Sequence, residues 1–373
     1  MKIPFVDLKA QYSSIQKEID AAVSAVITET AFVRGKYVSA FEEEYCNAYG
    51  VDHCISCANG TDALYIALKA LDIGPGDEVI TTALSWISTS ETISQTGARV
   101  VFADIESDYF TIDPSSIEEN ITDKTKAIIP VHLYGQSADM GKIMSLAERY
   151  QLAIIEDCAQ AHFAKYASKH VGTFGIAGTF SFYPGKNLGA YGDAGAIISN
   201  DEGFARRARM FANHGSLTKH QHEIEGINSR LDGLQAAILS VKLQYIDNWN
   251  SLRRSIAENY NEGLRGLDNI RTPLARKGAE HVYHLYVIRT DQRDKLQKRL
   301  KENGVASGIH YPCSLPFLKA YEYLGHKPED FPKALEYQPQ ILSLPMFPEL
   351  TEEMVEYVVS LIVGDRRKED RRV

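Results

Sequence analysis

The sequence predicts an α/β fold in which a large domain forms around a mostly parallel seven-stranded sheet and a smaller α+β domain follows it. Short apolar runs alternate with longer helical patterns across the first two thirds of the chain. The runs are apolar almost without interruption, which is typical of parallel strands covered by helices on both faces. The length of 373 residues exceeds the roughly 250–300 residues at which one hydrophobic core stops growing. We therefore expect two domains of unequal size.

The large domain is expected over residues 1–245, with an N-terminal arm at 1–12. Its strands are predicted at 54–57, 79–82, 100–104, 127–132, 153–157, 178–183 and 195–199, and its helices at 62–71, 88–96, 137–150 and 201–213. A long helical stretch at 231–260 leads into the smaller domain, expected over residues 246–373. There we predict a strand at 282–289, helices at 294–303, 317–324 and 352–363, and an extended piece at 309–311. The charged tail, 364–373, is expected to fray.

Charge and composition argue against several classes of protein. Lys and Arg total 40 against 49 Asp and Glu, and the net charge of -9 is unlike that of proteins that neutralise nucleic-acid phosphates. No stretch approaches the ~20 apolar residues of a membrane helix, and the first residues do not resemble a signal peptide. The five cysteines are odd in number and show no framework spacing. We expect a cytoplasmic protein that binds neither nucleic acid nor membrane.

Four short motifs suggest other chemistries, and each lacks a required part. Cys54 and Cys57 have no second pair at zinc spacing, and on a strand their side chains point to opposite faces. His220 and His222 have no carboxylate or third histidine at a defined offset, so we expect a solvated loop and no metal site. The glycines at 74–76 follow a helix and lack a third glycine, and the segment ending in Lys186 lacks the first glycine of a phosphate-binding loop.

Lys186 is the strongest candidate for a catalytic residue. It follows an apolar strand and lies in the glycine-rich segment 181–195, SFYPGKNLGAYGDAG. Glycines allow the backbone to approach a ligand closely. A lysine amine that is removed from water has a lowered pKa and becomes a nucleophile toward carbonyl groups. A lysine at an ordinary loop tip is the alternative, and the segment alone does not decide between them.

Three further segments favour the first interpretation. Asp157 ends a predicted strand, where its carboxylate is well placed to hold a protonated pyridine nitrogen. Gly60 and Thr61 open a helix, so backbone N–H groups with the Thr61 and Ser181 hydroxyls form a phosphate cup. Trp86 follows another strand, where its ring can stack on a flat cofactor. Helix capping and core packing remain the alternatives for these residues. Together the segments predict a pyridoxal phosphate site.

The chain resembles the nucleotide-sugar aminotransferases among the fold type I pyridoxal phosphate enzymes. The resemblance covers essentially the whole length and is carried by 3–8 (IPFVDL), 60–64 (GTDAL), 156–161 (EDCAQA), the Lys186 segment, 228–237 (NSRLDGLQAA) and 310–312 (HYP). Within the family, the chain is most similar to 3-aminotransferases of dTDP-linked 3-keto-6-deoxyhexoses. The resemblance implies that Lys186 binds the cofactor and moves a proton, and that glutamate donates the amino group.

The resemblance also assigns roles to residues that the patterns alone do not identify. It implies that Gln160 contacts the ring oxygen of the cofactor, and that Asn228 reaches the cofactor phosphate of the other subunit in a homodimer with shared active sites. Weaker candidates for contacts with the sugar or its pyrophosphate are Tyr183, Lys219, His310 and Tyr311. Three alternatives stay open: a 4-aminotransferase, a sugar dehydratase, in which His replaces the lysine, and a sensor that binds cofactor without turnover.

Overall fold

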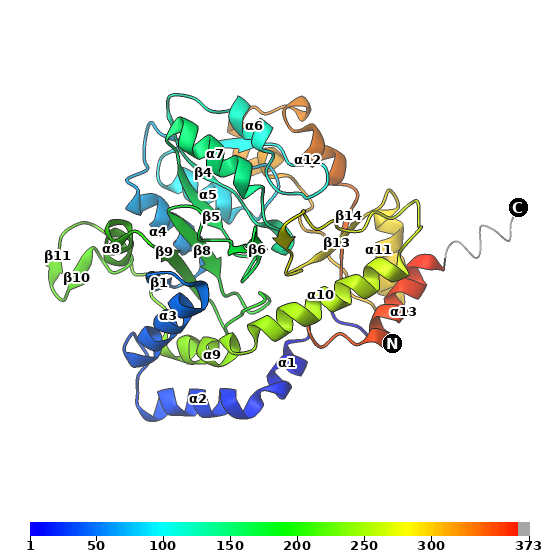
Figure 1. Cartoon of the computed structure of the whole chain (residues 1–373), viewed down its shortest axis with the longest axis horizontal. Coiled ribbons are helices and arrows are strands. Elements are labelled where there is room, and N and C mark those ends of the chain that lie inside the picture. Colours follow the sequence, from blue (N-terminus) through cyan, green and yellow to red (C-terminus); the bar gives the residue numbers. More distant parts are fainter. Residues whose placement is uncertain (365–373) are drawn as a thin grey trace, which may run out of the picture.

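The computed structural model describes residues 1–364, so most of the tail that was expected to fray lies outside the described residues. The large sheet has the strand order β1-β9-β8-β5-β4-β2-β3 (Figure 1). All strands run parallel except β9, which pairs antiparallel with both β1 and β8. The strands are β1 (His53–Cys57), β2 (Glu78–Thr82), β3 (Arg99–Ala103), β4 (Thr125–Ile129), β5 (Ala153–Asp157), β8 (Ala177–Ser181) and β9 (Gly195–Ser199). The predicted mostly parallel seven-stranded sheet is confirmed.

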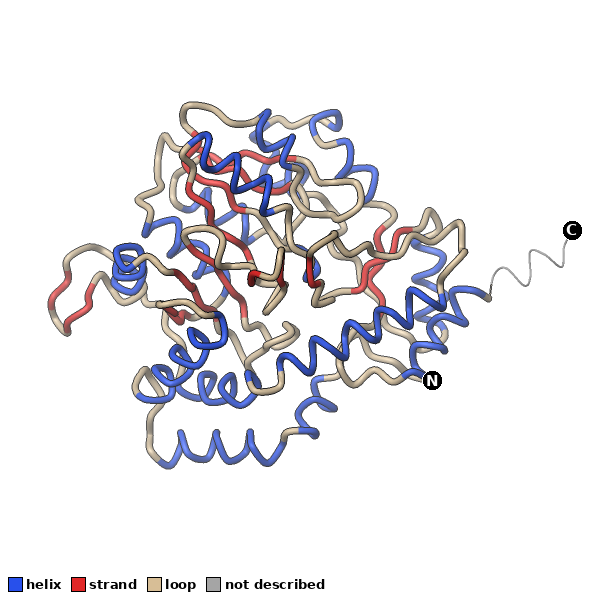
Figure 2. The backbone as a smooth tube through the Cα atoms, in the orientation of Figure 1, coloured by secondary structure: helices blue, strands red, loops and turns tan. Residues whose placement is uncertain are grey.

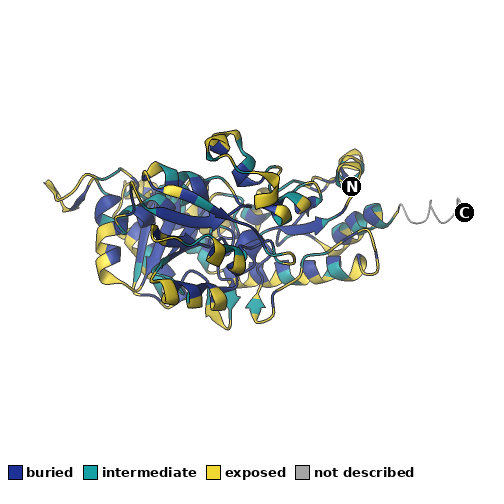
Figure 3. Ribbon diagram, turned by 90° about the horizontal axis from the view of Figure 1, so that it is seen from above, coloured by how far each residue is buried: buried dark blue, intermediate teal, exposed yellow. Residues whose placement is uncertain are grey.

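Helices cover both faces of this sheet, as Figure 2 shows. The predicted helices are α4 (Gly60–Ala70), α5 (Ser88–Gln95), α7 (Met140–Tyr150) and α8 (Glu202–Phe211), and α3 (Lys36–Tyr49) and α6 (Pro114–Glu119) add to them. Neighbouring strand residues enter different cores: Ile129 packs with the residues of α4 and α8, and Ile128 with those of α7. Cys54 and Cys57 are likewise free, buried and in separate clusters, as predicted. Figure 3 shows the buried strands enclosed by helices with exposed outer sides.

The stretch predicted as one helix over 231–260 is two helices, so that expectation is wrong in its middle. α9 (Gly233–Leu243) ends before Gln244, and α10 (Ile246–Gly263) begins after Tyr245. No glycine or proline marks the break. The buried Trp249 lies four residues after Tyr245 and stacks on it across the break, with ring centroids 5.7 Å apart. Three helices precede β1 in the chain: α1 (Leu8–Ser14), α2 (Gln16–Thr28) and α3.

The last part of the described chain forms a separate core around a two-stranded sheet. β13 (Tyr286–Arg289) pairs antiparallel with β14 (Ile341–Leu344), and α10, α11 (Arg293–Glu302) and α13 (Glu352–Val363) pack with it. Ile3 lies in this cluster and pairs with Val305, so the first residues of the chain contact the last part. The predicted strand at 282–289 exists only in its second half, and no strand forms at 309–311. The predicted helix at 317–324 is two short 3-10 helices, η2 (Leu315–Phe317) and η3 (Lys319–Leu324).

Short elements complete the described chain. They are η1 (Leu133–Gly135), β6 (Lys165–Tyr166), β7 (Lys169–His170), β10 (Ser216–Thr218), β11 (Gln221–His222), β12 (Ala279–Glu280), η4 (Pro328–Asp330) and α12 (Pro332–Tyr337). β10 and β11 form a hairpin that projects from the body of the molecule (Figure 1), where a loop was expected around His220. Among residues 1–364, none of the helices is both long enough and apolar enough to cross a bilayer.

Candidate active site

The functional candidates gather at the carboxyl ends of the parallel strands. Trp86 follows β2, Asp157 ends β5, Ser181 ends β8, and Lys186 lies in the loop after β8. Because these strands are parallel, their carboxyl ends lie at one edge of the sheet, which is where ligands bind in such folds. This is the placement that the sequence predicted.

Asp157 is a buried carboxylate with two hydrogen bonds and no salt bridge among the described residues. Its Oδ2 accepts from the Thr89 hydroxyl at 2.8 Å, and its Oδ1 accepts from the backbone N–H of Ala159 at 3.1 Å. Burial raises the pKa of this carboxyl, whereas the Thr89 and Ala159 hydrogen bonds and the charge of Lys186 act in the opposite direction. Each oxygen keeps a further lone pair, so the carboxylate can accept another N–H donor.

Lys186 lies at the tip of a tight loop that is closed at its base. The N–H of Ala190 donates to Phe182 O at 2.7 Å, and that of Lys186 donates to Tyr183 O at 2.8 Å. Removal from water lowers the pKa of the Lys186 amine to about 8, and Asp157 acts in the opposite direction. Among the described residues, the amine makes no hydrogen bond or ion pair. It is therefore available to a ligand and exists partly as a neutral nucleophile near pH 8.

The loop is anchored from behind by the helix α9. Lys242 is fully buried, and its Nζ donates to Gly189 O at 2.6 Å. The same ammonium lies 4.3 Å from the ring centre of Tyr191, whose backbone N–H donates to Gln235 Oε1 at 2.8 Å. Burial lowers the pKa of Lys242 to about 8, with Glu349 acting in the opposite direction. Two side chains of one helix thus hold the segment that carries Lys186.

The predicted phosphate cup has free donors at the start of α4. Asn59 caps the helix by accepting from the N–H of Asp62 at 2.8 Å, so this role does not fall to Thr61. Among the described residues, the N–H groups of Gly60 and Thr61 have no acceptor. A Cβ atom on Gly60 would lie 2.5 Å from Cβ of Ser181, so only glycine allows the two segments to meet. The Thr61 hydroxyl lies 2.7 Å from Ser88 Oγ, which turns it toward the same region.

Aromatic and amide side chains line another side of the candidate site. Gln160 Oε1 accepts from the backbone N–H of Tyr134 at 2.8 Å, which fixes the amide orientation. Its Nε2 then donates to the Tyr311 hydroxyl at 2.9 Å. The ring of Trp86, 59% exposed, lies 5.8 Å from that of Tyr311. His310 is held by its carbonyl, which accepts from the Tyr134 hydroxyl, and burial lowers its pKa to about 4, with the charge of Lys186 acting in the same direction.

The side chains of three predicted residues make no hydrogen bond to this cluster within the described residues. Tyr183 is 60% exposed, three residues before Lys186. Lys219 is exposed in the turn of the β10–β11 hairpin, away from the body (Figure 1). Asn228 is exposed, and its side chain makes no hydrogen bond among the described residues. Their surfaces are open, so any role for them in binding needs a ligand or a second subunit.

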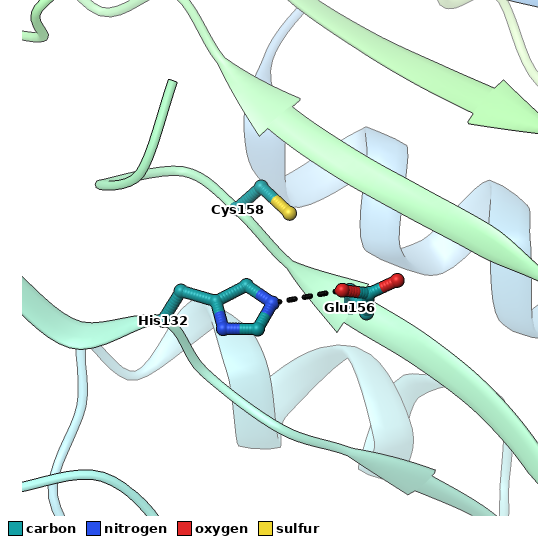
Figure 4. Close-up of side chains that lie close together, drawn as sticks. All are labelled: His132, Glu156 and Cys158. Carbon is teal, nitrogen blue, oxygen red and sulfur yellow. Dashed lines mark hydrogen bonds and ion pairs between the residues drawn. The ribbon is translucent and has the colours of Figure 1, made fainter. Parts of the chain in front are cut away.

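The buried side chains of His132, Glu156 and Cys158 lie close together beside β5 and are of types that bind metal ions (Figure 4). The lone pairs of Glu156 and His132 are already engaged in hydrogen bonds. Glu156 accepts from the N–H groups of Gly172, Phe174 and Gly175 at 2.7–2.9 Å. His132 Nδ1 accepts from the N–H of Ala138 at 3.1 Å, so Nε2 carries the proton and donates to Glu156 at 3.0 Å. A metal would have to displace these bonds. We assign the group as a structural hydrogen-bond network beneath Asp157.

The chain matches the DegT/DnrJ/EryC1/StrS aminotransferase family over residues 13–363. The chain belongs to this family. The match spans both cores and every segment that contributes to the strand-end cluster. Membership makes the protein an aminotransferase of the group that the sequence resemblance indicated.

Curated members of the DegT/DnrJ/EryC1/StrS family are similar to the chain over nearly their whole length. A Geobacillus stearothermophilus protein named pleiotropic regulatory protein is 47% identical over 97% of this chain and 98% of its own. A dTDP-3-amino-3,6-dideoxy-alpha-D-galactopyranose transaminase of Aneurinibacillus thermoaerophilus is 44% identical, with 96% and 98% covered. A UDP-N-acetyl-3-dehydro-alpha-D-glucosamine 3-aminotransferase of Acidithiobacillus ferrooxidans is 42% identical, with 96% and 97% covered.

Solved structures of the family share the fold. The crystal structure of DesV of S. venezuelae in complex with a ketimine intermediate has a TM-score of 0.95 and 40% identity, with 97% of this chain and 98% of that chain covered. This agreement confirms that the chain has the fold of its aminotransferase relatives.

The structure adds residues to the site that the sequence patterns did not reveal. Thr89 contacts Asp157, Ser88 contacts Thr61, and Tyr134 holds Gln160 and His310. Lys242 and Gln235 hold the Lys186 loop. One sequence signal was present for the first two, since Ser88 and Thr89 belong to a group of hydroxyl residues at 88–90 and 92, all of which are buried in α5. The others lie on distant segments and carry no local signal.

Proposed function

We propose that this family member transfers an amino group from an amino acid, L-glutamate, to C-3 of a dTDP-linked 3-keto-6-deoxyhexose, with pyridoxal 5'-phosphate as cofactor. The product is a dTDP-3-amino-3,6-dideoxyhexose, with the gluco configuration favoured. One observation carries the proposal: an amine with a pKa lowered to about 8 and a buried carboxylate meet at neighbouring strand ends. Five free thiols support the cytoplasmic location that the sequence predicts.

The residues present fit pyridoxal phosphate. Among the described residues, the buried Asp157 carboxylate forms no salt bridge, and a protonated pyridine nitrogen would supply a cationic partner. The N–H groups of Gly60 and Thr61, with the Ser181 hydroxyl, offer donors to a phosphate at a helix N-terminus. Trp86 presents an exposed ring for stacking, and Gln160 keeps one amide N–H free for a ring oxygen. Pyridoxal phosphate supplies an aldehyde that takes up amines and a ring that withdraws electrons.

Each side chain then has a defined task. Lys186 would hold the cofactor through Nζ, and its amine would accept and release the proton that leaves the donor carbon. An amine with a pKa near 8 suits this task, because it accepts and releases a proton at similar cost. Asp157 holds the ring nitrogen in its protonated form, and Thr89 and Ala159 orient the carboxylate.

We propose further that two subunits share each active site. Asn228 and Lys219 are exposed in one chain, and among the described residues their side chains make no hydrogen bond or salt bridge. Exposed apolar side chains lie nearby at Phe32 and Val33, and the strand-like bridge between Val33 and Asp232 joins their segment to the start of α9. In a homodimer, Asn228 reaches the cofactor phosphate of the partner, and Lys219 reaches the pyrophosphate of the partner's sugar nucleotide.

Mixing two inactive variants tests the shared site. A dimer of two Lys186→Ala subunits or of two Asn228→Ala subunits has no intact site. In a mixed dimer, one site contains both substitutions, and the other contains neither and is intact. Equal mixing with free subunit exchange is therefore expected to restore roughly a quarter of the wild-type activity. The measurement is amino-sugar formation after exchange, with mass spectrometry of the intact dimers as the control. Mixed dimers without recovered activity would contradict the shared site.

The choice of C-3 rests on the sugar pocket and on relatives. The segment 228–235 resembles the 3-aminotransferases, and Tyr183 stands where many 4-aminotransferases carry His. A phenol and an imidazole differ in length and in hydrogen-bonding pattern, so the exchange of one for the other would change how the sugar is oriented in the pocket. Two of the relatives have names that specify a sugar. Both names place the amino group at C-3, one on a dTDP sugar and one on a UDP sugar.

Offering defined substrates tests this choice. With glutamate as donor, dTDP-3-keto-6-deoxyglucose is expected to be aminated faster than its 4-keto isomer, because misfit leaves buried polar groups unpaired. A UDP-linked 3-keto hexosamine is the third substrate and tests the nucleotide. The galacto epimer, dTDP-3-keto-6-deoxygalactose, is the fourth and tests the configuration at C-4. Faster amination of the 4-keto sugar would contradict the C-3 assignment and leave the aminotransferase assignment intact.

A second function is favoured by one observation, the relative named pleiotropic regulatory protein. A sensor would bind the cofactor without turning over a donor. The visible absorbance of the bound cofactor distinguishes the two, since glutamate removes the aldehyde band in a transaminase and leaves it unchanged in a sensor. A sugar dehydratase would release water and ammonia without an amino sugar, and Lys186 argues against it.

A further inference from the structure

Asn187 directly follows Lys186, and its side chain is buried within a complete hydrogen-bond network. Its Nδ2 donates to Asn250 Oδ1 at 2.8 Å and to the carbonyl of Val282 at 3.0 Å. Asn250 is oriented in turn, because its Nδ2 donates to the carbonyl of His162 at 3.0 Å. Both amide orientations are therefore determined by carbonyl oxygens, which only accept hydrogen bonds.

This orientation decides which nitrogen of His284 carries a proton. Asn187 Oδ1 faces His284 Nδ1 at 3.2 Å. Since an amide oxygen only accepts, Nδ1 must carry the hydrogen, and Nε2 of a neutral ring keeps its lone pair. The tautomer of His284 is therefore determined by the residue next to Lys186, through a network that continues into α10.

Burial and charge keep this imidazole neutral. Burial lowers the pKa of His284 well below its usual range, and the neighbouring groups Lys186, Arg253, His310 and His162 act in the same direction. Asn187 is a neutral amide and supplies no negative charge that would stabilise an imidazolium. An aspartate differs from it by one atom and would supply that charge.

We propose that Asn187 is a positioning residue for Lys186: it fixes the base of the Lys186 loop and holds His284 in its neutral, Nδ1-protonated form, so that no imidazolium forms beside the amine. An imidazolium there would disfavour the ammonium form that Lys186 must adopt while it carries the proton. This inference rests on the proposed role of Lys186 and adds a control of its charge that acts through His284.

The first test uses the wild-type protein and needs no turnover. Nitrogen-15 NMR of histidine-labelled protein, with and without cofactor, reports the tautomer and protonation of each ring. The signal of His284 is assigned by its loss in His284→Asn, which keeps a donor at the Nδ1 position. We expect a neutral ring with the proton on Nδ1 throughout about pH 6–8. A proton on Nε2, or ionisation within this range, would overturn the proposal.

The second test introduces the missing charge with Asn187→Asp. A new ionisation is expected between about pH 6 and 8, both in the NMR signal of His284 and in the absorbance of bound cofactor. Below that pKa, the donor half-reaction is expected to slow at least about tenfold, with KM for glutamate changed less than about threefold. The double variant Asn187→Asp/His284→Asn should lose the new ionisation.

Asn250→Asp is the matched control, because it makes the same change in the same network without touching an imidazole. Absence of the new ionisation in folded Asn187→Asp, or its persistence in the double variant, would overturn the proposal. If Asn187→Asp does not fold, the wild-type NMR result decides alone. A fully active Lys186→Ala variant would instead refute the proposed function. The NMR experiment would still decide the tautomer and protonation state of His284.

Discussion

The Lys186→Ala variant is expected to lose amino-group transfer. Its amine, with a pKa lowered to about 8, is the group that we propose binds the cofactor and carries the proton. Loss of a positioned acid–base group alone costs about 10²–10⁴-fold in rate, and loss of the covalent link adds to this. The measurement is amino-sugar formation from a dTDP-3-keto sugar and glutamate, together with the absorbance of bound cofactor. Mass spectrometry after borohydride reduction should label wild-type Lys186 and leave the variant unlabelled.

Lys242→Met is the informative control for this experiment. Lys242 is also buried with a lowered pKa, but it contacts the loop backbone at Gly189 and not the reacting atoms. We expect this variant to remain covalently labelled at Lys186 and to retain part of its activity. Near-normal product formation by Lys186→Ala, or borohydride labelling that persists in Lys186→Ala and is lost in Lys242→Met, would reject Lys186 as the cofactor-binding lysine.

Asp157→Asn is expected to slow turnover by roughly 10²–10⁴-fold, since breaking one side of a buried ion pair costs ~3–5 kcal/mol. The amide cannot hold the ring nitrogen in its protonated form. The rate of each half-reaction and the absorbance of bound cofactor are the measurements, and both half-reactions should slow because both need the electron-withdrawing ring. Binding of the sugar nucleotide should change little.

Thr89→Val provides a graded comparison for the Asp157 result. It removes one hydrogen bond to the carboxylate and keeps the charge and the volume. A hydrogen bond to a charged group contributes about 1.5–3 kcal/mol, so we expect a loss of about 10–100-fold in rate. A variant Asp157→Asn within about twofold of wild type would show that Asp157 only caps the turn at Ala159.

The sequence determined the sheet and the positions of the main candidates. Continuous apolar runs mark the seven strands, and the observed bounds differ from the expected ones by a few residues at most. Asp157, Ser181 and Lys186 were placed at strand ends because a strand's end and the polar or glycine-rich residue after it are adjacent in the chain. Such local patterns report burial directly, since alternating and continuous apolar runs pack differently.

Packing between distant segments decided the rest. The break between α9 and α10 has no glycine or proline to predict it. The hydrogen bonds of Gln160 to Tyr134 and Tyr311, and of Lys242 to Gly189, join residues that are far apart in the chain. A linear pattern contains no information on such pairs, because their energies depend on the distance and direction between two atoms.

The same contrast holds for the charges of the site. The sequence identifies Lys186 as an unusual lysine from its glycine-rich loop, but only the folded structure shows that burial lowers its pKa to about 8. It likewise takes the structure to show that Asn187 fixes the tautomer of His284. Residue types and spacing therefore determined which groups the chain can use. Desolvation and hydrogen-bond direction exist only after the chain has folded, and they decided the protonation states of those groups.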